Sequence, residues 1–223
     1  MRAAGNRGTG ASGGAAGPAG TTASFGVIIL AGGAARRMGG ADKPGLAVGG
    51  RTMLESVVAA GIEAGAQRVV IAGPERRMDA GTGPAPRVAD EIAYVREEPP
   101  GAGPVPALRC GLAAVTGEWV AVLGADLPFL RADHLRALLR AAGGSRGAVL
   151  ADDAGRPQWV AGCWRASALR EAAARYRGGS LRGLLGPLEP VMLRLRPAPG
   201  TPPPWMDCDT VDDLRRARAW SGG

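Results

Sequence analysis

The sequence predicts a three-layer α/β domain of Rossmann-like type, with a mostly parallel sheet flanked by helices on both sides. Three observations predict it. Short apolar runs recur along the chain, a loop follows each run, and a helical segment comes next. Consecutive apolar residues are typical of strands that are buried on both faces of a parallel sheet. The alternation of strand, loop and helix predicts the crossovers that such a sheet requires.

The first half of the chain begins with an apolar run over 25–30, which predicts the first strand. A glycine-rich loop follows it. The pattern Thr52-Met-Leu-Glu55 is a capping box, so a helix is expected to begin there and to end near Ala64. The elements expected next are strands at 68–72 and 94–96, separated by a long loop, and a helix at about 105–114.

The second half begins with the clearest of the later strands, expected at 119–123. A loop over 124–130 separates it from a helix at about 132–141. The remaining expected elements are strands at 148–150, 160–164 and 191–195, and helices at 166–176 and 212–220. Ligands of such sheets bind beyond the carboxyl ends of strands. The loops after Leu30 and after Leu123 are therefore the first places to look for chemistry.

Length and composition predict one folded domain with an appendage. The chain has 223 residues, of which 46% are hydrophobic and 4% aromatic, so the core must be built mainly from aliphatic side chains. Residues 1–23 are almost entirely Gly, Ala, Ser, Thr and Pro and cannot bury enough surface to order themselves. We expect residues 1–23 to be a disordered tail and residues 24–221 to form the domain.

The formal charge of +7 comes without a run of five basic residues or a basic patch interleaved with aromatics. This pattern favours small anionic ligands such as phosphates over nucleic acid. The three cysteines stand far apart, at 110, 163 and 208, which argues against a disulfide framework and for a reducing compartment, the cytoplasm. No apolar run approaches the ~20 residues that a membrane helix needs, and the amino terminus lacks the apolar core of a secretory signal.

The loop from Leu30 to Lys43 is the first candidate for chemistry. Gly32 and Gly33 allow a sharp turn that presents backbone N–H groups to an anion, and Arg37 adds positive charge. The loop lacks the endings of a Walker A loop and of a dinucleotide fingerprint, so composition alone leaves a plain flexible turn equally open. Lys43 is the only lysine among 27 basic residues. Because an ammonium contacts phosphate differently from a guanidinium, this lone lysine favours a functional loop.

A carboxylate directly after a buried strand is the second candidate. Asp126 follows the strand expected at 119–123. Hard cations prefer oxygen ligands, so this position suits a metal ion. The alternative is that Asp126 caps the turn before the next helix, and the residues alone leave both open.

The loop resembles the signature of the molybdenum cofactor guanylyltransferase family, within the larger group of sugar-nucleotide-type nucleotidyltransferases. The matching stretch is Leu-Ala-Gly-Gly, three residues, Arg-Met-Gly and then Asp-Lys, and the resemblance spans about 25–220. It implies that the loop backbone and the lysine hold a triphosphate, with Arg37 as a helper by position. The corresponding residues are Leu30, Ala31, Gly32, Gly33 and Lys43. It also implies that Asp126, in a similar Asp-x-Pro stretch, binds Mg²⁺.

The same resemblance marks three further positions. The family has an aspartate before its Pro-Gly-x-Gly-Pro segment that contacts the nucleotide. Glu98 stands there in this sequence, and a plain polar loop residue is the alternative. Asp209, and less strongly Asp207, matches a stretch before the last helix, as a second metal or acceptor-side residue; the alternative is that Asp209 or Thr210 caps that helix. The family's guanine-binding asparagine is replaced by Ala72, which leaves the choice of base open.

The expected function is transfer of GMP from GTP to a molybdopterin-type cofactor, with Mg²⁺ as cofactor and pyrophosphate as the second product. The alternatives are a relative that uses CTP or another NTP on a different phosphate or sugar phosphate, and an inert nucleotide-binding adaptor. Intact Lys43 and Asp126 argue against the adaptor. The expected partners are the nucleotide, the phosphate-bearing acceptor and other proteins of cofactor biosynthesis, with no nucleic acid and no membrane.

Overall fold

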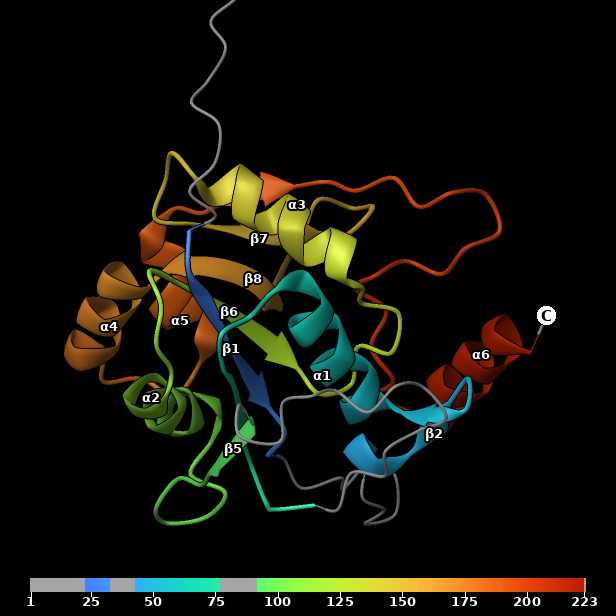
Figure 1. The fold of residues 1–223 in the computed structure, drawn as a ribbon, viewed down its shortest axis with the longest axis horizontal. Coiled ribbons are helices and arrows are strands. Elements are labelled where there is room, and N and C mark those ends of the chain that lie inside the picture. The colour runs from blue at the N-terminus through green and yellow to red at the C-terminus, as the bar shows by residue number, and fades with distance from the viewer. Residues whose placement is uncertain (1–22, 33–42, 77–91, 223) are drawn as a thin grey trace, which may run out of the picture.

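The computed structural model describes residues 23–32, 43–76 and 92–222. A seven-stranded sheet with the order β5-β4-β1-β6-β8-β7-β9 forms the middle layer (Figure 1). The strands are β1 (Phe25–Leu30), β4 (Val69–Ala72), β5 (Ile92–Val95), β6 (Trp119–Gly124), β7 (Gly147–Ala151), β8 (Pro157–Arg165) and β9 (Val191–Leu193).

The strands β5, β4, β1 and β6 run parallel, as does the pair β7 and β9. The exception is β8, which lies between β6 and β7 and is antiparallel to both. The prediction of a mostly parallel sheet is therefore confirmed. All six residues of β6 are buried, as are five of the six in β1, in agreement with their continuous apolar sequences.

The helices form a layer on each face of the sheet. They are α1 (Met53–Ala64), α2 (Pro104–Ala114), α3 (Ala132–Ala142), α4 (Ala166–Arg175) and α5 (Leu181–Leu185), with a 3₁₀ turn η4 (Gly186–Leu188). One core holds buried side chains of α1 and α3 against the sheet. The other core holds those of α2, α4 and α5. Figure 1 shows α1 and α3 together on one face.

A third, smaller hydrophobic cluster lies beside the sheet. It packs the hairpin of β2 (Ala47–Val48) and β3 (Arg51–Thr52), through Val48, and the first residue of α1 against the last helix, α6 (Val211–Ser221). A 3₁₀ turn, η2 (Lys43–Gly45), comes just before this hairpin. The buried members of the cluster are Val48, Met53, Cys208, Leu214 and Ala217, with Leu46, Phe129 and Met206 packed against them. We call these eight residues the docking cluster. Figure 1 shows α6 next to the hairpin, to the right of the sheet.

Most predicted elements appear within a residue or two of their expected bounds. The capping box of Thr52 and Glu55 is present in both directions at the start of α1. The hairpin β2–β3 and the short helix α5 were not predicted, and β8 begins three residues earlier than expected. The long loop expected between β4 and β5 lies partly, and the predicted tail almost wholly, outside the described residues. Within the described residues, no helix is long and apolar enough to cross a membrane.

Candidate active site

The carboxyl ends of β1, β4 and β6 meet at one edge of the sheet. The Ala31 amide donates to the Ala72 carbonyl at 2.9 Å, and the Ala125 amide donates to the Leu30 carbonyl at 3.2 Å. Leu30, Ala31, Gly32 and Ala72 therefore lie together at this edge. Gly33 and Arg37, also predicted as site residues, lie outside the described residues.

Asp126 follows β6 directly, and its side chain folds back over the end of that strand. A Cβ atom at Gly124 would lie 2.7 Å from Asp126 Oδ1 and 3.1 Å from a methyl group of Val160. Such an approach is too close for non-bonded atoms, so Gly124 provides the space that the carboxylate occupies. The Asp126 side chain is 23% exposed, which leaves it open to a ligand at the sheet edge.

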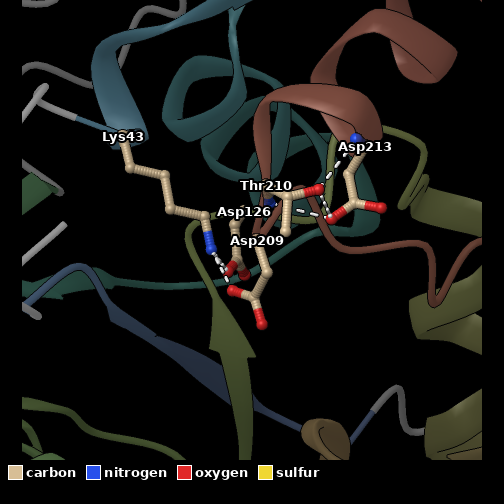
Figure 2. Close-up of polar contacts among 5 residues, drawn as sticks. All are labelled: Lys43, Asp126, Asp209, Thr210 and Asp213. Carbon is tan, nitrogen blue, oxygen red and sulfur yellow. Dashed lines mark hydrogen bonds and ion pairs between the residues drawn. The ribbon is translucent and has the colours of Figure 1, made fainter. Parts of the chain in front are cut away.

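The ammonium of Lys43 lies between two carboxylates from distant parts of the chain. Nζ is 2.5 Å from Asp126 Oδ2 and 2.5 Å from Asp209 Oδ1 (Figure 2). Burial by itself would lower the pKa of Lys43, but the charges and hydrogen bonds of the two aspartates outweigh it and raise that pKa. The lysine is therefore charged at neutral pH and pairs with both acids.

The segment before α6 shows which residue caps that helix. Thr210 is the N-cap of α6, since its hydroxyl accepts from the Asp213 amide at 3.1 Å and Asp213 Oδ2 accepts from the Thr210 amide at 2.8 Å. Because Thr210 does the capping, the Asp209 carboxylate is free to contact Lys43, and its side chain is 50% exposed. Loss of solvent and the charges of Asp209 and Asp126 raise the pKa of the neighbouring Asp207.

Glu97, which the sequence analysis did not single out, is a buried acid near the same loop. It is 5% exposed, and its Oε1 accepts from the Gly101 amide at 2.9 Å, while Oε2 is buried without a partner among the described residues. A Cβ atom at Gly32 would lie 3.7 Å from Glu97 Oε1 and 3.8 Å from the Ala72 carbonyl, so this carboxylate lies beneath the loop. Glu98, the predicted position, is exposed. Glu97 and Glu98 are adjacent acids, and nothing in the sequence shows which of them is buried. The structure distinguishes Glu97 by its burial and by an oxygen without a partner among the described residues.

The acidic groups offer a divalent cation two protein ligands. Asp126 and Asp209 each place an oxygen at one cationic position, which the Lys43 ammonium holds in this structure. No group of three or more His, Cys, Asp or Glu side chains arranged for a metal ion occurs among the residues described. A site with one or two carboxylates, completed by phosphate oxygens and water, is the arrangement that Mg²⁺ commonly takes in nucleotide enzymes. The residues present therefore fit such an ion.

A glycine-containing loop, a lysine and an aspartate at the carboxyl edge of a mostly parallel sheet define a nucleotidyltransferase of the α/β class. The model of the MobA-like NTP transferase domain matches residues 27–191. The chain belongs to this family, whose curated members include molybdenum cofactor guanylyltransferases.

Individual relatives agree with this assignment. The probable molybdenum cofactor guanylyltransferase of Opitutus terrae is 36% identical over 155 residues, which cover 68% of this chain and 71% of that protein. A nucleotidyl transferase structure from Methanothermobacter thermautotrophicus superposes with a TM-score of 0.69 and 22% identity, over 89% of this chain and 97% of that one. The 2-C-methyl-D-erythritol 4-phosphate cytidylyltransferase of Thermus thermophilus superposes with a TM-score of 0.61 and 23% identity, over 89% and 98%. At these identities the two structures establish the shared fold alone.

Proposed function

We propose that this protein transfers GMP from GTP to a molybdopterin-type cofactor and releases pyrophosphate. The observation that carries the proposal is the convergence of Lys43, Asp126 and Asp209 at the carboxyl edge of the sheet, beside the glycine-containing loop. The names of the curated relatives support guanine as the base and molybdenum cofactor as the acceptor. The three cysteines are free, in keeping with a cytoplasmic setting for this reaction.

The reaction needs alignment more than proton transfer. An oxygen of the acceptor's terminal phosphate forms a bond to the α-phosphorus of the nucleotide. The bond from that phosphorus to the β-phosphate oxygen breaks, and pyrophosphate leaves with the electron pair. Because the attacking phosphate is already anionic, no strong general base is required. The protein's work is to hold both phosphates in line and to neutralise the charge that develops.

Lys43, Asp126 and Asp209 supply this charge balance. Asp126, with Asp209 as the second and more exposed carboxylate, would hold Mg²⁺. The ion when bound supplies Lewis-acid stabilisation of phosphate oxygens. Lys43 lies next to both carboxylates and would donate to the phosphates that leave. The backbone of Leu30, Ala31 and Gly32 would approach the triphosphate from the adjacent strand end, with Gly33 and Arg37 continuing that loop.

Glu97 takes the nucleotide-contacting role that the sequence suggested for Glu98. Its Oε1 lies near Gly32, and its Oε2 is buried with no hydrogen-bond donor among the described residues. The ring N–H and amino groups of guanine, or the hydroxyls of a ribose, are donors of the right kind. A buried carboxylate oxygen without a donor is costly, so supplying a donor to Oε2 on binding would contribute to affinity for the nucleotide.

A second candidate function is the same transfer with CTP or another NTP as donor. The observation that favours it is Ala72, a fully buried alanine at the carboxyl end of β4, whose methyl group cannot select a base by hydrogen bonding. An inert nucleotide-binding adaptor is the remaining alternative. It would keep a binding loop but has no need for the pair of carboxylates around Lys43. Other proteins of cofactor biosynthesis are proposed partners, as donors of the acceptor or recipients of the product.

The test is pyrophosphate release from each of the four NTPs in the presence of molybdopterin, with chromatography of the dinucleotide product. We expect turnover with GTP and loss of turnover in Asp126→Asn. The matched control is Glu118→Gln, an acid at the opposite end of β6 that pairs with Arg165 in an exposed ion pair. Turnover with CTP instead would select the second candidate, and tight NTP binding without turnover would select the adaptor.

A further inference from the structure

The Lys43 ammonium holds the position at which the two carboxylates of the site converge. Its distances of 2.5 Å to Asp126 Oδ2 and 2.5 Å to Asp209 Oδ1 compare with about 2.1 Å for oxygen ligands of Mg²⁺. Figure 2 shows the three side chains pointing toward one another from three separate segments. A cation that binds both of these oxygens must therefore take the volume that Nζ fills.

Electrostatics reinforces this steric conflict. Two acids and one ammonium leave a formal local charge of minus one, whereas the acids alone carry minus two. Lys43 and Asp126 side chains are only 16% and 23% exposed, so solvent screens their interaction less than that of surface ions. A divalent cation that approaches Asp126 and Asp209 while Lys43 is bound to them meets the like charge of the ammonium within a few ångströms. The ammonium also neutralises half of the negative charge that the two carboxylates would offer the cation.

We propose that Lys43 and the divalent cation compete for Asp126 and Asp209, and that the triphosphate removes the competition by drawing the lysine onto its own oxygens. This rests on the proposed function for the identity of the anion that attracts Lys43. The protein alone then binds the metal poorly, and nucleotide and metal bind with positive coupling. By linkage, the metal strengthens nucleotide binding by the same factor. Lys43 thus disfavours binding of the metal to a site that holds no nucleotide.

The proposal predicts opposite effects of one substitution on two ligands. Lys43→Met keeps the length and flexibility of the side chain but removes the ammonium. Affinity for Mn²⁺ in the absence of nucleotide should rise by about tenfold, within the usual range of coupling between sites. Affinity for GTP should fall. If Lys43 merely held the two aspartates in position, its loss would let them repel each other and move apart. Lys43→Met would then lower the affinity for Mn²⁺.

The measurement is the free Mn²⁺ signal in electron paramagnetic resonance, titrated against wild type and Lys43→Met without nucleotide. The matched control is Arg175→Met, which removes one exposed cation from α4 and its pair with Glu171. This control should leave Mn²⁺ affinity unchanged, which separates the local contact from net charge. Equal or weaker Mn²⁺ binding by folded Lys43→Met overturns the proposal. In the double variant Lys43→Met, Asp209→Asn the gain should disappear; if it persists, Mn²⁺ binds elsewhere and the proposal is wrong.

The lone lysine allows its movement to be observed directly. Protein labelled with ¹³C-lysine contains a single lysine spin system, since Lys43 is the only lysine in the chain. GTP with a chelator present should shift its Cε resonance, and Mg²⁺ alone should shift it only at concentrations that saturate the carboxylates. An unchanged resonance at saturating Mg²⁺ means that lysine and metal bind together, which contradicts competition. The Mn²⁺ titration uses no nucleotide and no turnover, so its outcome is independent of whether the proposed transfer reaction is found.

Discussion

The two halves of the candidate site are held by cores of very different size. Asp126 follows β6, a strand that is buried along its whole length and hydrogen-bonded by β1 on one side and β8 on the other. Lys43 and Asp209 stand on short segments next to the smaller docking cluster, and α6 buries just Leu214 and Ala217. Asp126 therefore follows a central strand of the main sheet, whereas its two partners stand on short segments beside a small cluster and a few hydrogen bonds. We therefore expect that contacts in the site can be lost without unfolding the domain.

The largest effect should come from the same substitution made in each region. Leu135 is 1% exposed in the core under α3, and Leu214 is 7% exposed in the docking cluster. Leu135→Ala should lower the free energy of unfolding by about 2–5 kcal/mol, because it leaves a cavity between sheet and helix. Leu214→Ala should lower it less, since α6 can detach locally, but should lose more activity.

Chemical denaturation and steady-state kinetics on both variants, well below their melting temperatures, measure this comparison. Circular dichroism shows whether each remains folded at the assay temperature. Equal losses of stability with equal losses of activity would mean that the docking cluster is an integral part of the main core, and the distinction drawn between the two regions would be wrong.

Asp126→Asn should give the next largest effect. The amide keeps the size of the side chain and its ability to accept a hydrogen bond but loses the charge that a divalent cation needs. We expect turnover to fall by at least ~10²-fold, which is typical for loss of a key electrostatic contact. Asp209→Asn should cost less, since its side chain is 50% exposed. Raised Mg²⁺ should restore part of the loss, and near-normal turnover in folded Asp126→Asn would refute its role.

The difference between the two regions also explains what the sequence could predict. The strands of the main sheet were predicted because each is a local apolar run, and α1 because Thr52 and Glu55 form a local capping box. Lys43 and Asp126 were singled out as candidates because each belongs to a short motif. Their meeting with Asp209 was not predicted, because Lys43 and Asp209 are 166 residues apart in sequence. Nothing local records such a contact.

Other features were missed for different physical reasons. The hairpin β2–β3 has two residues in each strand, too few for a periodic pattern. The antiparallel direction of β8 depends on how the chain returns to the sheet, which its own residues do not record. Glu97 and Glu98 are adjacent acids before the same loop, and only the packing beneath Gly32 decides that Glu97 is the buried one.

Lys43→Arg tests whether the site beside the docking cluster requires an ammonium or only a positive charge at position 43. The charge is kept, so the protein should fold normally. A guanidinium is bulkier and directs its donors in a fixed plane, whereas the ammonium points its donors into the narrow gap between two carboxylates. We expect activity to fall roughly tenfold, about 1.4 kcal/mol of transition-state stabilisation. Lys43→Ala should be worse in turnover as well as in NTP affinity. If Lys43→Arg matches wild type in steady-state kinetics, then position 43 requires only a positive charge and not an ammonium in particular.

Glu97→Gln and Glu98→Gln form a matched pair of substitutions just after β5 of the main sheet. The first removes the charge from a buried carboxylate with an unpartnered oxygen, and the second from an exposed one. Glu97→Gln should weaken NTP binding by about fivefold, roughly the net contribution of one hydrogen bond. Glu98→Gln should leave it unchanged. Equilibrium titration with each NTP measures both. A larger loss in Glu98→Gln would return the nucleotide-contacting role to the residue that the sequence first suggested.

The smallest effect, and the sharpest test of the comparison, comes from two helix caps of the same design. Thr52 caps α1 and Thr210 caps α6, each through a capping box with an acid three residues on. Thr52→Ala and Thr210→Ala each remove one side-chain acceptor, which is worth about 1 kcal/mol. In Thr52→Ala that cost should appear in the unfolding of the whole domain, because α1 after Met53 buries Leu54, Val57 and Val58 in the main core.

In Thr210→Ala the same cost should appear mostly as local fraying of α6. Thr210 is the residue after Asp209, so loosening the first turn of α6 displaces the carboxylate that contacts Lys43. Hydrogen exchange of the α6 amides should increase while the global unfolding midpoint hardly moves, and turnover should fall about threefold, in line with part of a 1 kcal/mol cost. Thr52→Ala should show the opposite division, with a lower midpoint and unchanged turnover. A site residue that depends on a small docked helix should respond to loss of the cap of that helix. If both substitutions shift the midpoint equally and neither alters turnover, then Asp209 is fixed by the main fold as firmly as Asp126.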